Sequence, residues 1–97
     1  MHEPAPAVTC EVTDDGWRCL VTVGDDAAAT EHEVLVDHGS ANDLAPGASP
    51  EALVEASFVF LLEREPRESI MRSFELPIIG RFFADYPDEI RRRLTPG

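Results

Sequence analysis

The chain has 97 residues, which is enough for one domain with a single modest core. Its 19 acidic residues stand against 8 arginines and no lysine, so the formal net charge is -11. An acidic balance of this size repels phosphate backbones and disfavours non-specific binding of nucleic acid. The apolar runs are too short to span a bilayer, and the N-terminus lacks the basic and apolar regions of a signal peptide, so we expect a cytoplasmic protein with no membrane segment.

The charges are unevenly distributed along the chain. Residues 1–63 contain 13 acidic residues and one arginine, whereas residues 64–97 contain 6 acidic residues and 7 arginines. The first part therefore carries a net charge of -12 and the second part +1. Solubility alone is the simplest explanation for the acidic excess, because net charge affects solubility before it indicates a function.

The first half of the chain predicts strands. Residues 1–6 are rich in proline and alanine and are expected to form a flexible lead-in, followed by a single domain over residues 7–97. Apolar and polar residues alternate over 7–13 and over 17–23, on either side of an Asp-Asp-Gly turn, which predicts a β-hairpin.

The pairing of the hairpin decides the environment of its two cysteines. Both apolar rows share a face only if Val12 lies opposite Trp17 or opposite Cys19. The first pairing places Cys10 directly across from Cys19, where a disulfide is geometrically conceivable. In a reducing cytoplasm we expect two small buried thiols instead.

Residues 30–38 predict a third strand, with His32 and His38 at the two ends of its apolar face. About 20 Å of strand separates these histidines, so they cannot share a metal ion, and we expect them at the edge of the core or at a rim. Residues 39–48 read as a long turn-rich loop, which either crosses from sheet to helix or binds a ligand.

Residues 49–65 predict one long helix. Ser49 is a suitable N-cap, Pro50 suits the first helical position, and Pro66 ends the segment. Residues 58–62 are five consecutive apolar residues, which cover more than one helix face and predict burial from at least two sides.

The remaining chain predicts short helices over residues 66–74, 78–83 and 88–94, separated by prolines. Together these elements predict an α+β fold. We expect a three-stranded antiparallel meander followed by three or four helices, with the long helix packed on one sheet face.

The second half of the chain resembles a family of small, uncharacterised bacterial proteins of about 100 residues. The resemblance is carried by SFVFLLEREPRESI at residues 57–70, SFELPII at 73–79 and RFF at 81–83, and more weakly by residues 53–55, Trp17 and residues 32–34. It implies a domain in which strands precede helices, and it implies no functional residues. The family has bulky aromatic residues after the third strand, where this chain has His-Gly-Ser at 38–40.

No motif of a catalytic centre is present. The sequence contains no glycine-rich phosphate loop, no zinc-ligand spacing and no nucleophile elbow, so we expect no enzyme activity, no cofactor and no metal.

The apolar excess in the last third of the chain suggests a binding function. These residues either complete the core or form a patch that contacts a partner or a second subunit. The predicted partner-binding residues are Arg67, Arg72, Ile78, Arg81, Phe82 and Tyr86.

The sequence thus indicates a non-enzymatic interaction or regulatory domain. The alternative is a nucleic-acid-binding module that uses four C-terminal arginines, Arg81, Arg91, Arg92 and Arg93. Arginines at the end of the last helix also suit the helix dipole, and we prefer that structural explanation for residues 91–93.

Overall fold

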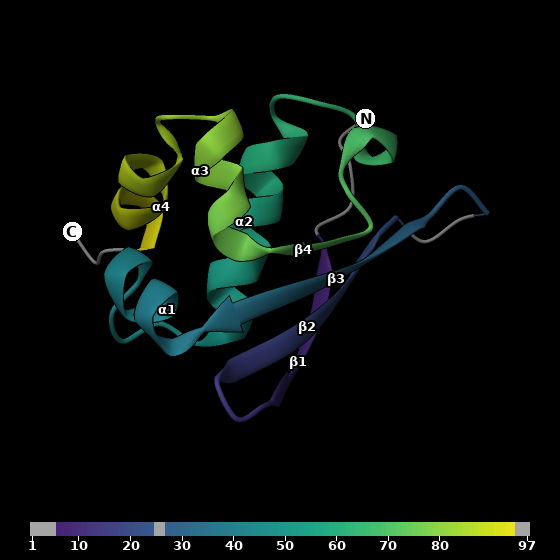
Figure 1. Ribbon diagram of the computed structural model, residues 1–97. Coiled ribbons are helices and arrows are strands. Elements are labelled where there is room, and N and C mark those ends of the chain that lie inside the picture. The colour runs from purple at the N-terminus through teal and green to yellow at the C-terminus, as the bar shows by residue number, and fades with distance from the viewer. Residues whose placement is uncertain (1–5, 25–26, 95–97) are drawn as a thin grey trace.

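The computed structural model describes residues 6–24 and 27–94. A four-stranded sheet carries the helices on one side (Figure 1). Among the described residues no helix is both long and apolar enough to cross a membrane. The predicted lead-in falls on residues 1–5, which lie outside the described part, and on Pro6, which is buried.

The sheet is mixed. Strands β1 (Ala7–Val12), β2 (Gly16–Val23) and β3 (Thr30–Asp37) form the predicted antiparallel meander, and β4 (Ser73–Glu75) adds a parallel strand beside β3. The α+β class is confirmed, but the prediction of three strands was wrong. Phe74 of β4 lies beside Val34 of β3, so the fourth strand extends the apolar face of the sheet.

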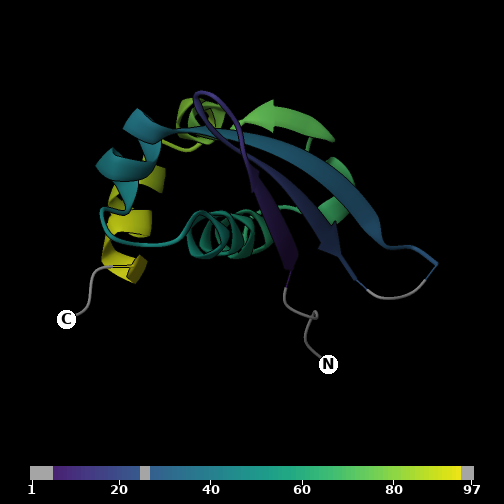
Figure 2. The same ribbon diagram turned by 90° about the horizontal axis from the view of Figure 1, so that it is seen from below.

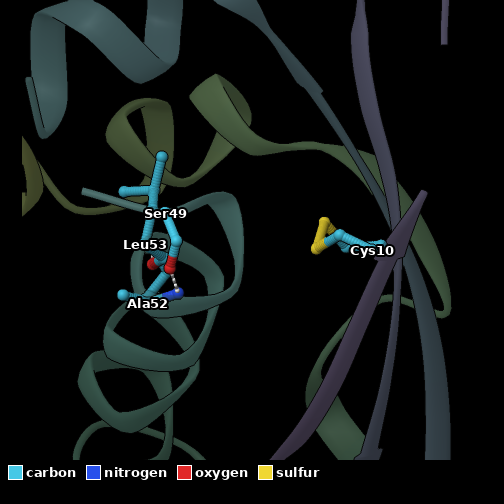
Figure 3. Close-up of a disulfide and its surroundings, with 6 residues drawn as sticks. Cys10, Ser49, Ala52 and Leu53 are labelled. Atoms are coloured by element: carbon cyan, nitrogen blue, oxygen red, sulfur yellow. Dashed lines mark hydrogen bonds between the residues drawn. A yellow bond between two sulfur atoms is a disulfide. The ribbon is translucent and has the colours of Figure 1, made fainter. Parts of the chain in front are cut away.

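The hairpin adopts the first of the two predicted pairings. Val12 lies opposite Trp17 and Cys10 lies opposite Cys19, with 4.0 Å between the Cα atoms of the two cysteines. The structure contains a disulfide between these cysteines, so the expectation of free thiols was wrong. Figure 3 shows the disulfide projecting from the hairpin toward the first turn of the long helix.

A short helix, α1 (His38–Leu44), replaces the predicted loop. The third strand ends at Asp37, one residue earlier than predicted, because the Asp37 carboxylate caps the helix. It accepts hydrogen bonds from the Ser40 backbone N–H at 3.0 Å and from the Ser40 hydroxyl at 2.6 Å. These bonds lower the pKa of Asp37.

The long helix α2 (Pro50–Leu62) begins where the sequence predicts and ends three residues earlier. Ser49 accepts a hydrogen bond from the Ala52 backbone N–H at 3.1 Å (Figure 3). The predicted burial from two sides is confirmed. Phe58 packs toward the sheet against Phe74, and Phe60 packs on the other side against Tyr86.

The C-terminal third is less helical than predicted. It consists of two single 3-10 turns, η1 (Arg67–Ser69) and η2 (Leu76–Ile78), strand β4 between them, and helices α3 (Ile79–Phe82) and α4 (Tyr86–Leu94). The prediction of a helix over 66–74 was wrong, because the later part of this segment pairs with the free edge of β3 instead. The Glu33 backbone N–H donates to the Arg72 carbonyl at 2.7 Å, and His32 Nδ1 lies 2.8 Å from the Met71 carbonyl.

The last helix closes the helical layer. α4 and α1 lie side by side (Figures 1 and 2), joined by Arg91, which donates to the carboxylate and the backbone carbonyl of Asp43. The core lies on both sides of α2, toward the sheet and toward the later helices, and contains the largest fully buried side chains, which include Tyr86, Phe58, Phe60, Leu53, Leu76 and Ile90.

Candidate functional site

An apolar groove of about 290 Å³ lies between the end of α2, the segment around η1, β4 and α3. Its lining residues are Leu61, Glu65, Ser69, Ile70, Met71, Phe74, Ile78, Ile79, Phe82 and Phe83. Eight of the ten are apolar, and all come from the region between residues 61 and 83. Met71, which precedes β4, and Phe74 of β4 line the groove together with residues of α3.

The groove combines a buried floor with exposed apolar edges. Ile70, Phe74 and Ile79 are buried and form part of the core. Phe82 is 66% exposed and Met71 is 43% exposed. Large apolar side chains that stay exposed beside a hollow are typical of surfaces that bind another molecule.

Two polar residues interrupt the apolar lining, Glu65 and Ser69. Glu65 is half-buried, and among the described residues its carboxylate has no ion pair and no side-chain hydrogen bond. The neighbouring Arg64 does not neutralise it, because its guanidinium lies over the Phe60 ring at 3.6 Å and pairs with Asp85 at 2.9 Å. Glu65 is therefore the one charged residue in the lining of the groove, and no ion pair is found for it among the described residues.

The structure separates the residues that the sequence predicts for partner binding. Ile78 and Phe82 line the groove, and Arg81 is exposed on α3 outside its lining. The Arg67 guanidinium packs against the end of β2, and Arg72 borders a different hollow beside β2 and β3. The three arginines therefore do not form a common rim around the groove.

The prediction that Tyr86 contacts a partner was wrong. Tyr86 is only 1% exposed, because it fills the space between α2 and α4. Its hydroxyl lies 2.7 Å from Ser57 Oγ, and Ser57 Oγ donates to the Leu53 carbonyl at 2.8 Å, so the tyrosine hydroxyl is the donor to Ser57. Burial raises the pKa of Tyr86 to about 12.

The C-terminal arginines pair with acidic residues of the same chain. Arg91 contacts Asp43 at 3.0 Å, and Arg92 contacts Glu89 at 2.5 Å. Arg93 contacts Glu63 at 2.6 Å, a hydrogen bond that lowers the pKa of the Glu63 carboxyl. These pairs place a carboxylate beside each positive charge of residues 91–93 and weaken the field that a phosphate backbone would meet.

The two histidines have different environments. His32 is buried inside the core and not at its edge or at a rim as expected, and both its ring nitrogens have partners. Since a carbonyl only accepts, Nδ1 donates to Met71, and Nε2 accepts from the Thr30 hydroxyl. His38 is exposed and packs against the Trp17 ring, with 4.7 Å between the ring centroids. Within residues 6–24 and 27–94, no group of three or more His, Cys, Asp or Glu residues is placed to hold a metal ion.

Sequence reasoning missed Leu61, Glu65 and Ser69 as groove residues. Leu61 and Glu65 belong to the segment predicted as the long helix, and in that helix their spacing of four residues would place them on one face. That spacing was available in the sequence, but the facing wall was not, because Met71 and Phe74 were assigned to a helix instead of a strand.

Comparisons of the chain with protein-family models, with curated proteins and with solved structures found no match.

Proposed function

We propose that this chain is a non-enzymatic protein-interaction domain that binds an apolar segment of a partner protein in the groove beside α3. The observation that carries the proposal is the exposure of Phe82 and Met71 at the edge of an apolar hollow with a buried floor. A segment that covers these two side chains removes their exposed apolar surface from water, which contributes about 25 cal/mol for each Å² buried.

Charge specifies the partner further. Glu65 is the one charged residue that lines the groove, and the whole chain carries a net charge of -11. A segment with a lysine or arginine next to its apolar residues therefore complements the groove both locally and at long range. We infer that the partner segment is apolar and basic.

The nucleic-acid alternative has less support. Arg81 is exposed, but Arg91, Arg92 and Arg93 have acidic partners within the chain. The expected cytoplasmic location stays a prediction, and the disulfide between Cys10 and Cys19 favours an oxidising compartment.

The proposal is tested by selecting binders from a library of random peptides displayed on phage, with the intact oxidised protein immobilised. We expect selected peptides to share bulky apolar residues next to a lysine or arginine. Binding of the best synthetic peptide should weaken by about tenfold or more in Phe82→Glu, since a charge then replaces an apolar contact. Glu65→Gln should reduce the preference for the basic residue.

Leu20→Glu is the matched control, because Leu20 is also an exposed large apolar residue, 50% exposed, but lies on the sheet face outside the groove. It should leave peptide binding unchanged. Peptides whose binding is lost in Leu20→Glu and retained in Phe82→Glu would refute the groove as the binding site.

A further inference from the structure

The first strand presents an unpaired backbone edge. The Thr13 backbone N–H donates to the Gly16 carbonyl at 2.9 Å at the turn of the hairpin. Thr13 and Gly16 are therefore a hydrogen-bonded pair of the antiparallel ladder. In an antiparallel ladder the hydrogen-bonded pairs alternate along each strand, so Ala7, Thr9 and Glu11 point their backbone groups toward β2. The 4.0 Å between the Cα atoms of Cys10 and Cys19 agrees, because close Cα spacing is typical of a non-hydrogen-bonded pair.

It follows that Val8, Cys10 and Val12 point their backbone N–H and C=O groups away from the sheet. Among the described residues no hydrogen bond to these groups is found, because β1 is the first strand in the order β1-β2-β3-β4. The strand contains no proline, no lysine and no bulge, which are common devices that protect a free edge. The opposite edge differs, since β4 has only three residues.

The side chains of the same three residues share one face of β1. Val12 is 79% exposed, and Val8 and Cys10 are half-buried. α2 packs against β1, but Val12 at the turn end of the strand stays exposed, so the apolar row of β1 is only partly covered. A strand that paired with β1 would bring a second apolar row beside this one and cover Val12.

We propose that β1 pairs in antiparallel orientation with β1 of a second copy of this chain, which joins the two sheets into one of eight strands. The edge is self-complementary. When Cys10 lies opposite Cys10 of the second copy, Val8 lies opposite Val12 of that copy, and every outward-pointing backbone group meets a partner. Thr9 then lies opposite Glu11 of the second copy. A shift of the pairing by two residues toward the hairpin turn would place Glu11 opposite Glu11, which like-charge repulsion disfavours.

The charges on β1 itself permit this contact, whereas the net charge of each copy opposes it. Glu11 is the single charged residue of β1, and it is paired with Arg18 at 2.7 Å. Each copy nevertheless carries a net charge of -11, so two copies repel each other at low ionic strength. Salt screens this repulsion, and we expect the dimer to strengthen as salt is raised. The strand contact alone is small, so the dimer should be weak and dependent on concentration.

Amide hydrogen exchange followed by NMR tests the proposal on the unmodified oxidised protein. The backbone N–H groups of Val8, Cys10 and Val12 should exchange freely in dilute protein and slow by about tenfold or more in concentrated protein at high salt. Thr9 and Glu11 are internal controls, because their N–H groups are already bonded to β2. Light scattering under the same conditions should show the mass moving toward that of a dimer.

Two substitutions at one exposed position separate backbone pairing from side-chain contact. Val12→Pro removes an outward N–H and should weaken dimerisation by about tenfold, since the symmetric contact loses two backbone hydrogen bonds, one from each copy. Val12→Thr keeps the N–H and should largely retain the dimer. Far-UV circular dichroism establishes that both variants are folded.

A monomer at every concentration and salt level, with free exchange at Val8, Cys10 and Val12, would overturn the proposal. A dimer that survives Val12→Pro and is abolished by Phe82→Glu would also overturn it, because the subunit contact would then be the groove. Neither result depends on whether the groove binds peptides, so this proposal and the proposed function fail separately.

Discussion

His32 is held as a neutral imidazole inside the core. It is 2% exposed, it packs against Phe58 at 5.2 Å, and its two ring nitrogens join Met71 and Thr30. Burial lowers the pKa of His32, since the charged form loses its hydration there, and the positive charge of Arg72 acts in the same direction. The side chain thereby fixes the segment before β4 to β3.

This environment makes the stability of the fold dependent on pH. The unfolded chain binds a proton at His32 near pH 6.5, whereas the folded chain binds it only at lower pH, so the contribution of His32 is complete above about pH 6.5 and is lost as the pH falls below it. We expect the free energy of unfolding, measured with urea between pH 7.5 and pH 5, to decrease by about 1.4 kcal/mol for each unit by which the pKa is lowered.

His32→Asn should be less stable at pH 7.5 and should lack the part of the decrease that His32 causes, because an amide can still donate to Met71 but does not titrate. His38→Asn is the matched control, since His38 is exposed on the surface, and it should keep the decrease. Identical pH profiles for the wild-type protein and His32→Asn would contradict the assignment.

Individual residues were predicted best where their partners are close in sequence. The Ser49 cap is an example, because its acceptor and the donor on Ala52 are three residues apart. Tyr86 was misjudged, because what buries it is Ser57 and Phe60 of α2, more than twenty residues earlier in the chain. The local sequence around Tyr86 predicts only a break between two helices.

At the scale of elements, the start of α2 is specified by its cap. Ser49→Ala removes the acceptor of the Ala52 N–H and should destabilise the protein by about 1 kcal/mol, which corresponds to a decrease in Tm of about 4 to 8 °C for a domain of this size. Ser49→Asp keeps an acceptor at this position and should stay close to the wild-type Tm. Thermal unfolding followed by circular dichroism measures both. Equal losses in the two variants would show that the hydroxyl group acts through packing and not as a cap.

Elements with a strong local pattern were predicted, and those created by tertiary contacts were not. The alternation of apolar residues identifies β1, β2 and β3, and the caps and apolar run identify α2. Strand β4 has three residues and pairs with β3 about 40 positions away, so no local pattern could reveal it. Helix α1 contains Gly39 and Asn42, which are poor helix formers, and is held by the Asp37 cap and by Arg91 of α4.

The groove could be predicted only in part, because it too depends on tertiary contacts. Its apolar composition was visible in the sequence as an excess of Ile and Phe in the last third, and Ile78 and Phe82 were identified from it. Its shape depends on the pairing of β4 with β3, which places Phe74, and Met71 just before the strand, in the wall of the groove. The cavity could therefore not be derived before the pairing of β4 with β3 was known.

For the whole molecule, the disulfide is a covalent link within the hairpin. It joins positions separated by 9 residues, and a closed loop of this length is expected to stabilise the fold by roughly 2 to 3 kcal/mol. Reduction with a phosphine should therefore lower the Tm of the wild-type protein. A double variant with Cys10→Ala and Cys19→Ala should have the lower Tm with or without the reductant. A wild-type Tm that the reductant leaves unchanged, with free thiols confirmed by mass spectrometry after alkylation, would show that the link adds no stability.

The packing of α2 has a consequence for synthesis of the chain. Phe58 and Phe60 are fully buried, but Phe74 covers one from β4 and Tyr86 covers the other from α4. A ribosome delivers the meander and α2 first, so a nascent chain leaves these two phenylalanines without their final neighbours until residues 74 and 86 have emerged. During that interval we expect the growing chain to expose an apolar helix, and the surface that can aggregate becomes covered only when the last helix has arrived.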